Sequence, residues 1–263
     1  MKVFDIDRAG TGTAEWAEKN ENISRGCSNN CLYCYAAQNS ARFKQRPRTE
    51  WEREEFTKKA YITSYPARDG VIMFPSAHDV TPFNVDAYLR VAKLILASGN
   101  RLLIVSKPRI DCIRRLVAEL TSFQEQIMFR FTIGSIDAAV TSFWEPGAPP
   151  PAERLQALKL AYDAGYRTSV SGEPLLGGVG TALSVIDAVR PWVTDTVWIG
   201  KMNKMRQRVD MSSDRNAAEV MAIERLQADE EIEKLYERLK DDPIVRWKDS
   251  VKDVVQRRLR RVG

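Results

Sequence analysis

Three cysteines within eight residues constrain this chain more than any other feature. Cys27, Cys31 and Cys34 follow the pattern C-x3-C-x2-C, just after an apolar, strand-like start at residue 22. Thiolates at this spacing can surround one small inorganic centre, and iron–sulfur clusters are usually held by four of them. Three ligands would therefore leave one iron of a cubane cluster free to bind another molecule.

Other uses of these cysteines stay open from the residues alone. A structural zinc site normally takes four ligands, and the only histidine, His78, is distant in sequence. A disulfide framework is typical of small secreted domains. The fourth cysteine, Cys112, falls in an amphipathic stretch, where we expect a buried small hydrophobic residue.

The composition is that of a globular chain with a large core. Of the 263 residues, 44% are hydrophobic and 29% are charged. No run approaches the roughly 20 apolar residues that span a bilayer, and the first 16 residues lack the apolar region of a signal peptide. We therefore expect a cytoplasmic protein without a membrane partner. The net charge of +5 permits a polyanionic partner without identifying one.

Short apolar runs alternate with amphipathic stretches from residue 70 onward. This alternation is typical of βα units and a parallel sheet. With one strand before the cysteines, the runs predict six strands. In barrel enzymes the chemistry lies at the C-terminal ends of the strands. The predicted runs are 70–74, 101–106, 126–133, 166–172 and 195–200, with helical patterns at 84–98, 109–121, 151–164 and 181–190 between them.

The cysteine motif resembles that of the radical S-adenosylmethionine (radical SAM) superfamily, and Tyr33 is similar to the aromatic residue that usually precedes the third cysteine. The resemblance implies an α/β fold, a partial (βα)6 barrel of TIM type, over residues 22–203. It also implies a [4Fe-4S] cluster on the three cysteines, with SAM on the free iron. An external reductant such as flavodoxin or ferredoxin would drive cleavage of SAM to a 5′-deoxyadenosyl radical, which takes hydrogen from the substrate.

Two stretches resemble one branch, that of spore photoproduct lyase and its DNA-repair-photolyase-like relatives. They are the C-x-Y-C-Y end of the cluster loop and an E-P-G-A-P-x-P turn that precedes E-R-L. The resemblance implies that Tyr33 and Tyr35 guide a radical or simply pack against the cluster, and in this branch a cysteine at the end of the second strand donates hydrogen. Ser76-Ala77-His78 stands at that place, which favours a different fate for the substrate radical.

The resemblance assigns several strand-end residues to SAM. Ser76 and Asp79 would bind its amino group, although the two glycines usual there are missing. Lys107 and Ser135 map onto family contacts to SAM, and a surface position is the alternative for Lys107.

Arg154, Glu173 and His78 each have two interpretations, and the adenine site has one. Arg154 would neutralise the SAM carboxylate or hold the turn at Glu145 through an ion pair. Glu173 would bind a ribose hydroxyl or a substrate amine, or cap a helix. Met202 or Asn203 would line the adenine site. His78 could shuttle protons or form a hydrogen-bonded rim residue.

The two ends of the chain differ from the predicted barrel. Residues 1–21 form an N-terminal extension to which no chemistry is assigned, and 204–263 form a charged helical extension that could close the open side of the barrel. The basic end of that extension, 256–261, is the best candidate for a nucleic-acid contact, or else a solvated helix end. A basic stretch at 36–60 is either solvated or a strip that contacts phosphates.

These observations predict a radical SAM enzyme of lyase or isomerase type. Its substrate would be a modified base in DNA or a nucleotide, with repair or remodelling of a pyrimidine as the reaction. One alternative is a radical SAM isomerase or maturase that acts on an amino-acid-like group or peptide. An alternative of another class is a non-catalytic iron–sulfur or zinc module that binds DNA.

Overall fold

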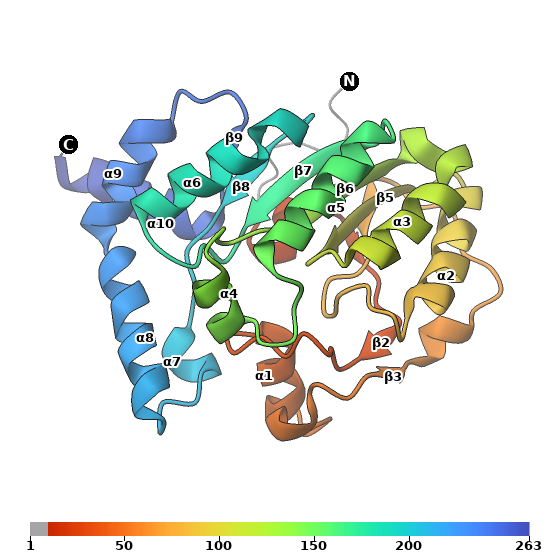
Figure 1. The fold of residues 1–263 in the computed structure, drawn as a ribbon, viewed down its shortest axis with the longest axis horizontal. Helices are drawn as coiled ribbons and strands as arrows, with labels where there is room; N and C mark the ends of the chain where they lie inside the picture. The colour runs from red at the N-terminus through yellow and green to blue at the C-terminus, as the bar shows by residue number, and fades with distance from the viewer. Residues whose placement is uncertain (1–9, 263) are drawn as a thin grey trace.

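A curled sheet of parallel strands forms the centre of the computed structural model, which describes residues 10–262 (Figure 1). Seven strands lie in the order β1-β4-β5-β6-β7-β8-β9, and each neighbouring pair is parallel. The sheet curls into a half-barrel, which is the predicted fold class. The strands are β1 (Lys19–Asn20), β4 (Val71–Met73), β5 (Arg101–Ser106), β6 (Ile127–Thr132), β7 (Arg167–Gly172), β8 (Val197–Ile199) and β9 (Val245–Trp247).

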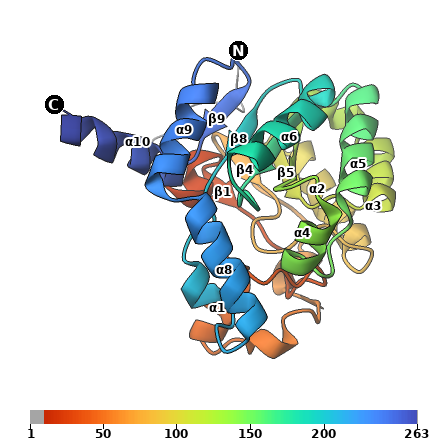
Figure 2. The same ribbon diagram turned by 60° about the vertical axis from the view of Figure 1, so that its left-hand side comes forward.

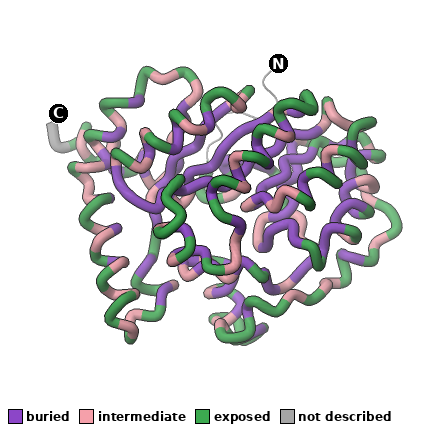
Figure 3. Tube along the Cα trace, viewed as in Figure 1, coloured by how far each residue is buried: buried purple, intermediate pink, exposed green. Residues whose placement is uncertain are grey.

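The middle strands are buried on both faces. Every residue of β6 is buried, and in β5 only Arg101 is exposed. Figure 3 shows the same contrast between the buried sheet and the partly exposed helices around it. Continuous apolar strands of this kind are typical of a parallel sheet that is covered on both sides.

Helices follow the strands and cover the outside of the half-barrel, as the alternating pattern predicts. The helix after β6 starts at Pro151, where a proline at the first helical position sets the backbone angle at no cost in hydrogen bonds. A shorter helix, α4 (Ala138–Trp144), precedes it. The covering helices are α2 (Val85–Ala97), α3 (Ile110–Glu119), α5 (Pro151–Asp163) and α6 (Val179–Val189), joined in part by the 3-10 turns η4 (Thr121–Gln126) and η5 (Arg190–Trp192).

The prediction of six strands is wrong by one, because β9 adds a strand beyond β8. It lies in the segment expected to be entirely helical, and three residues are too few to give a visible period in the sequence. The first strand, β1, pairs with β4 from within the expected N-terminal extension. Boundaries at residues 22 and 203 therefore cut both edge strands from the sheet.

The start of the described chain packs against residues 248–249 beside the sheet. Lys248 is fully buried and pairs with the equally buried Glu15 of η1 (Gly12–Glu15). The backbone N–H of Asp249, the first residue of α10 (Asp249–Val262), donates to Glu15 at 3.1 Å, and Gly12 N–H donates to Asp249 at 3.1 Å. Residues 1–9 of the expected N-terminal extension lie outside the described part of the chain.

Most of the remaining elements lie below the strand ends, whereas α9 (Asp229–Leu239) packs against α6 and α10 beside the sheet (Figures 1 and 2). None of the described helices is long and apolar enough to cross a membrane. The other elements are α1 (Tyr35–Arg42), α7 (Met205–Arg208), α8 (Asp214–Leu226), the antiparallel pair β2 (Ser24–Arg25) and β3 (Glu55–Phe56), and the turns η2 (Arg48–Glu50) and η3 (Lys58–Tyr61).

Candidate functional site

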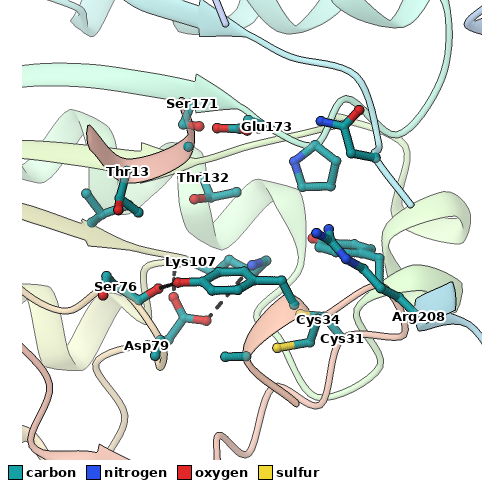
Figure 4. Close-up of a pocket in the computed structure, with 18 of the residues that line it drawn as sticks. Thr13, Cys31, Cys34, Ser76, Asp79, Lys107, Thr132, Ser171, Glu173 and Arg208 are labelled. Atoms are coloured by element: carbon teal, nitrogen blue, oxygen red, sulfur yellow. Dashed lines mark hydrogen bonds and ion pairs between the residues drawn. The ribbon is translucent and has the colours of Figure 1, made fainter. Parts of the chain in front are cut away.

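A cavity of about 740 Å³ lies at the C-terminal ends of the strands (Figure 4). This is the edge at which barrel enzymes carry their chemistry. The cluster loop supplies one end of the cavity, and η1, α7 and the start of α10 supply walls elsewhere. Cys27, Cys31 and Cys34 all line the cavity, so the three predicted ligands are brought together at one end of it.

The backbone of the cysteine loop has a conformation at position 26 that favours glycine. Gly26 has a φ of +85°, and a Cβ there would clash with the carbonyl oxygen of Arg53. Cys27 N–H donates to the carbonyl of Trp51 at 2.8 Å. Cys34 caps α1, because its sulfur accepts a hydrogen bond from Ala37 N–H at 3.4 Å.

The proline-rich turn after α4 holds this loop from the other side. Gly147 N–H donates to the carbonyl of Asn29 at 3.1 Å, and a Cβ on Gly147 would clash with the carbonyl oxygen of Ser28. Arg109 joins the two segments, since it donates to Asn29 Oδ1 at 3.0 Å and to the Gly147 carbonyl at 2.5 Å. The E-P-G-A-P-x-P motif therefore has a structural reason: its glycine packs directly on the cluster loop.

Arg46 and Arg48 of the predicted basic stretch form contacts within the protein. Arg46 is buried and pairs with Glu55. Arg48 donates to the carbonyl of Cys31 at 2.9 Å. The basic stretch at 36–60 also contains Arg42 and Lys44, which are exposed. The interpretation of the stretch as a strip that contacts phosphates is therefore wrong for Arg46 and Arg48.

The thiols are in surroundings that oppose a bare negative charge. Burial raises the pKa of Cys27 well above its usual range, and nearby Asp79 adds to the effect. Burial likewise raises the pKa of Cys31 to about 12, which Lys107 partly offsets. All three are free cysteines, and soft thiolate sulfur suits iron–sulfur clusters. Among residues 10–262 no three histidine, cysteine or acidic side chains are grouped to hold a single metal ion.

Asp79 lies beside the loop with its carboxylate fully engaged. It accepts hydrogen bonds from Asn29 Nδ2 at 2.8 Å, Ser106 Oγ at 3.0 Å and Lys107 N–H at 2.7 Å. Burial opposes its ionisation, but the charge of Lys107 and these hydrogen bonds outweigh burial and lower its pKa. Asp79 is therefore an internal anion that positions the loop.

Lys107 sits between two carboxylates rather than in open solvent. Its Nζ is 4.0 Å from Asp79 Oδ2 and 4.0 Å from Glu145 Oε1, and 5.7 Å from the centre of the Tyr33 ring. Burial works against its charge, but Cys31 and the two carboxylates raise its pKa. The alternative of a surface lysine is wrong, because its side chain is only 12% exposed.

Glu145 completes this buried network. The Tyr33 hydroxyl donates a short hydrogen bond to Glu145 Oε1, and Arg154 pairs with Glu145 Oε2 at 2.5 Å. Arg154 also donates to the carbonyl of Pro149 at 2.7 Å and does not line the cavity. Of its two interpretations, the ion pair that holds the Glu145 turn is the one present in the structure.

Tyr35 and Ser76 meet across the cavity wall near the cysteines. The Tyr35 hydroxyl donates to the Ser76 carbonyl at 2.5 Å, and burial together with nearby Cys34 raises the pKa of Tyr35 to about 12. The Ser76 hydroxyl accepts from Asn22 Nδ2 at 2.9 Å. His78 is a buried structural residue, since its Nε2 accepts from the backbone N–H groups of Ile23 and Ser24. Burial also lowers its pKa.

Hydroxyl and carboxyl groups line the cavity at the ends of β6 and β7. Thr132 and Ser171 are paired in register on these strands, and Glu173 comes directly after the end of β7 (Figure 4). Ser171 Oγ is buried without a hydrogen-bond partner in the described part of the chain. Burial raises the pKa of Glu173 to about 7, although Lys248 lies 3.6 Å away and favours the carboxylate.

Besides Arg154, two residues predicted to contact SAM do not line this cavity. Ser135 is buried, and its hydroxyl accepts from Asp137 N–H at 3.0 Å. Met202 is packed in an apolar cluster with Cys31 and Trp144.

Other lining residues carried no recognisable signal in the sequence. Thr13 and Trp16 come from the N-terminal segment, and Asp249 comes from the start of α10. Arg208 lies on a helix of four residues and points toward the cavity beside Cys34 (Figure 4). Its Nε is buried and has no hydrogen-bond partner among the described residues.

Comparisons with known proteins agree with the fold. No protein-family model matches the chain. Over 196 residues it is 25% identical to the uncharacterized protein ORF301 of Acidianus two-tailed virus, a match that covers 66% of this chain and 61% of the viral protein. The chain thus spans less than two thirds of that relative.

Solved structures of radical SAM enzymes share the half-barrel. A spore photoproduct lyase variant with a dinucleoside spore photoproduct matches with a TM-score of 0.58 at 14% identity, over 91% of this chain and 78% of that one. Another variant, with bound AdoMet and the dinucleoside, gives 0.55 over the same shares at 14% identity. SuiB of Streptococcus suis bound to S-adenosylmethionine gives 0.51 at 9% identity, over 85% of this chain and 48% of SuiB. The expected resemblance to radical SAM enzymes is confirmed at the level of the fold.

Proposed function

We propose that this protein is a radical SAM enzyme in which Cys27, Cys31 and Cys34 hold a [4Fe-4S] cluster. The observation that carries the proposal is the convergence of three free thiols on one end of a cavity at the strand ends of the half-barrel. When bound and reduced, the cluster with SAM would supply a 5′-deoxyadenosyl radical that takes hydrogen from a C–H bond.

The buried network beside the cysteines prepares the loop for such a group. Lys107 places a positive charge near Cys31 and between Asp79 and Glu145, which favours thiolates that are otherwise costly to bury. Tyr33 and Arg154 fix Glu145 from two sides. We therefore assign these residues to positioning, although the sequence also suggested SAM contacts for Asp79, Lys107 and Arg154.

SAM would be bound by polar groups that face the cavity. Ser76 and Glu173 keep their proposed roles toward its amino group and its ribose, because both line the cavity. Ser171 and Thr132 join them, since their paired positions point two hydroxyls at the same space. Ser135 and Met202 do not line the cavity, so they would affect SAM binding only by positioning the backbone around them.

Tyr35 would guide the radical chemistry, because it faces the cavity and is fixed by Ser76. The strand-end cysteine of the related lyase has no thiol counterpart at Ser76-Ala77-His78. Cys112 is buried in the core that contains α3, away from the cavity lining. We therefore propose remodelling of the substrate rather than direct reversal of a photoproduct.

The proposed substrate is a modified pyrimidine in DNA or a nucleotide. Two of the similar lyase structures hold a dinucleoside, which supports a nucleotide in this fold. A cytoplasmic location with flavodoxin or ferredoxin as electron donor would suit the cluster.

Anaerobic turnover tests this function. The reconstituted protein would be incubated with dithionite, SAM and either ultraviolet-irradiated or untreated DNA, and the digested nucleosides would be analysed by mass spectrometry. We expect 5′-deoxyadenosine together with a changed nucleoside in the irradiated sample. Cleavage of SAM with no change in any nucleoside would contradict the substrate class, and SAM left intact would contradict the enzyme class.

An amino-acid-like group is the second candidate substrate. The cavity is lined by Arg208 and by the carboxyls of Glu173 and Asp249, and opposite charges suit a zwitterion as well as a nucleotide. Peptide and amino-acid mixtures in the same turnover experiment would reveal it as a mass change that the DNA samples lack.

A further inference from the structure

Several cations on the described surface are paired with carboxylates. In the basic end of the chain, Arg257 donates to Asp229 at 2.8 Å and Arg258 to Glu237 at 3.0 Å. On α7, Arg206 forms two hydrogen bonds with Glu224. The pairs of Arg257 and Arg258 neutralise part of the positive charge at residues 256–261.

In the part of the chain that the structure describes, the C-terminal end of α1 combines exposed, unpaired cations with an exposed aromatic ring. Within the described residues, Arg42 and Lys44 have exposed side chains with no ion pair to a carboxylate. Phe43 between them is 64% exposed, and the Arg42 guanidinium lies 5.6 Å from the centre of its ring. An exposed aromatic ring flanked by two available cations is a typical combination for binding a nucleic-acid strand, because the ring stacks on a base and the cations contact phosphates.

This surface continues into the cavity through α7. Gln38 Nε2 donates to the Gln207 carbonyl at 2.9 Å, which joins α1 to α7 (Figures 1 and 2). Arg42 is one turn beyond Gln38 on the same face of α1. Arg208 follows Gln207, lines the cavity and has its buried Nε without a hydrogen-bond partner in the described structure.

Acidic side chains also line the cavity. Glu173 and Asp249 are among them, and both present carboxyl oxygens. The cavity lining therefore offers one ligand both a guanidinium and hydrogen-bond acceptors. A nucleotide suits this combination, since its phosphate is anionic and its base carries N–H donors.

We propose that Arg42, Phe43, Lys44 and Arg208 form a basic entrance that binds single-stranded nucleic acid and leads one nucleotide into the cavity. Arg208 contacts a phosphate at the mouth, while Phe43 stacks on a base outside it. A base that reacts inside this cavity would have to leave any helical stack, as in other enzymes that modify bases. This proposal rests on the proposed nucleotide substrate and names the surface that would select it.

Oligonucleotide binding by the reconstituted full chain tests the entrance without any turnover. The probe is a fluorescent 15-mer of deoxythymidine, measured by anisotropy between 50 and 200 mM salt. The double variant Arg42→Ala/Lys44→Ala should weaken binding about 10-fold or more at the lowest salt. It should also reduce the log–log salt slope by about 1.4, since each phosphate contact on a single strand contributes roughly 0.7.

The matched control removes the same charge from the paired end of the chain. Arg257→Ala/Arg258→Ala should change the affinity less than about threefold and leave the salt slope unchanged, because these cations are already neutralised. An equal loss in both double variants would overturn the proposal, as would failure of the unaltered protein to bind the probe at 50 mM salt.

Phe43→Ala separates stacking from charge. It should weaken binding about 5- to 10-fold with an unchanged salt slope. No effect on the affinity would contradict the role given to the aromatic ring.

Arg208→Gln distinguishes the two anions that could meet this guanidinium, the substrate phosphate and the SAM carboxylate. We expect weaker oligonucleotide binding and an unchanged Kd for SAM. Loss of SAM affinity with unchanged oligonucleotide binding would remove Arg208 from the entrance. A protein that cleaves SAM but binds no oligonucleotide would contradict only this inference, whereas one that binds the probe but never cleaves SAM would contradict the proposed enzyme.

Discussion

The buried network beside the cysteines and the rest of the cavity lining are built in opposite ways. At the cysteine end, Asp79, Lys107, Glu145 and Arg154 satisfy one another through buried ion pairs and hydrogen bonds. In the rest of the lining, Arg208 and Ser171 carry buried polar atoms with no hydrogen-bond partner in the described residues, and Glu173 is held by a single lysine.

This difference separates residues that build the site from residues that meet a ligand. A buried charge is tolerated only when it is paired, so the cysteine end is complete as a protein structure except for what the thiols bind. Buried polar atoms left without partners are uncommon in folded proteins and call for an explanation. A bound SAM and substrate would supply the hydrogen-bond partners that Arg208 and Ser171 lack.

Loss of a cluster ligand should have the largest effect. Cys27→Ala removes one of three thiolates, so iron content should fall from about four per chain to background, and SAM cleavage should cease. Iron analysis and quantification of 5′-deoxyadenosine would measure both. Cys112→Ala is the control, because this buried cysteine lies outside the cavity lining. A cluster kept by Cys27→Ala, or lost in Cys112→Ala, would break the assignment of ligands.

The buried network should respond to mutation in its stability. Arg154→Met leaves Glu145 buried and without its guanidinium partner, so the free energy of unfolding should fall by about 3–5 kcal/mol. Urea denaturation measures this change. Arg206→Met removes an exposed pair with Glu224 and should cost no more than about 1 kcal/mol. Similar losses in the two variants would mean that the cysteine end is not held by this network.

The pKa of Glu173 predicts how stability depends on pH. A carboxyl whose pKa is raised to about 7 by burial binds its proton more tightly in the folded state than in the unfolded state. Its contribution is therefore greatest at low pH and is lost as the pH rises from about 4.5 to about 7, by an amount on the order of 2 kcal/mol. Glu173→Gln should remove this part of the slope in urea titrations. An unchanged slope would show that Glu173 is ionised throughout.

Ser171→Ala should give the smallest change in stability and a selective change in binding. The hydroxyl has no partner to lose, so the free energy of unfolding should change by less than about 0.5 kcal/mol, while the Kd for SAM or substrate rises roughly 2- to 10-fold. Ser169→Ala is the matched control on the same strand. Its hydroxyl donates to the carbonyl of Thr196 at 2.7 Å and accepts from Arg130 Nε, so its loss should lower stability by about 1–3 kcal/mol. The reverse pattern would place Ser171 among the structural residues.

The sequence predicts those parts of the fold that are set by local pattern. The strand at residues 101–106 is found with the same bounds, because its apolar run is long and ends at polar residues. The three cysteines and Glu173 are found at the cavity because the strand ends of a parallel sheet share one edge.

What the sequence does not reveal depends on contacts between distant segments. β9 is a strand only because β8 offers it an edge. Thr13 and Trp16 reach the cavity because Glu15 pairs with Lys248, more than 230 residues later in the chain. Arg46 looks like a surface cation until its partner Glu55 is seen.

Electron paramagnetic resonance tests the central claim most directly, namely that Cys27, Cys31 and Cys34 hold a cluster with one iron free for SAM. The sample is the anaerobically reconstituted protein reduced with dithionite, measured before and after addition of SAM. We predict the signal of a reduced [4Fe-4S] cluster that changes shape when SAM binds and is missing in Cys27→Ala. A protein without an iron signal, or a signal unaffected by saturating SAM, would contradict the account.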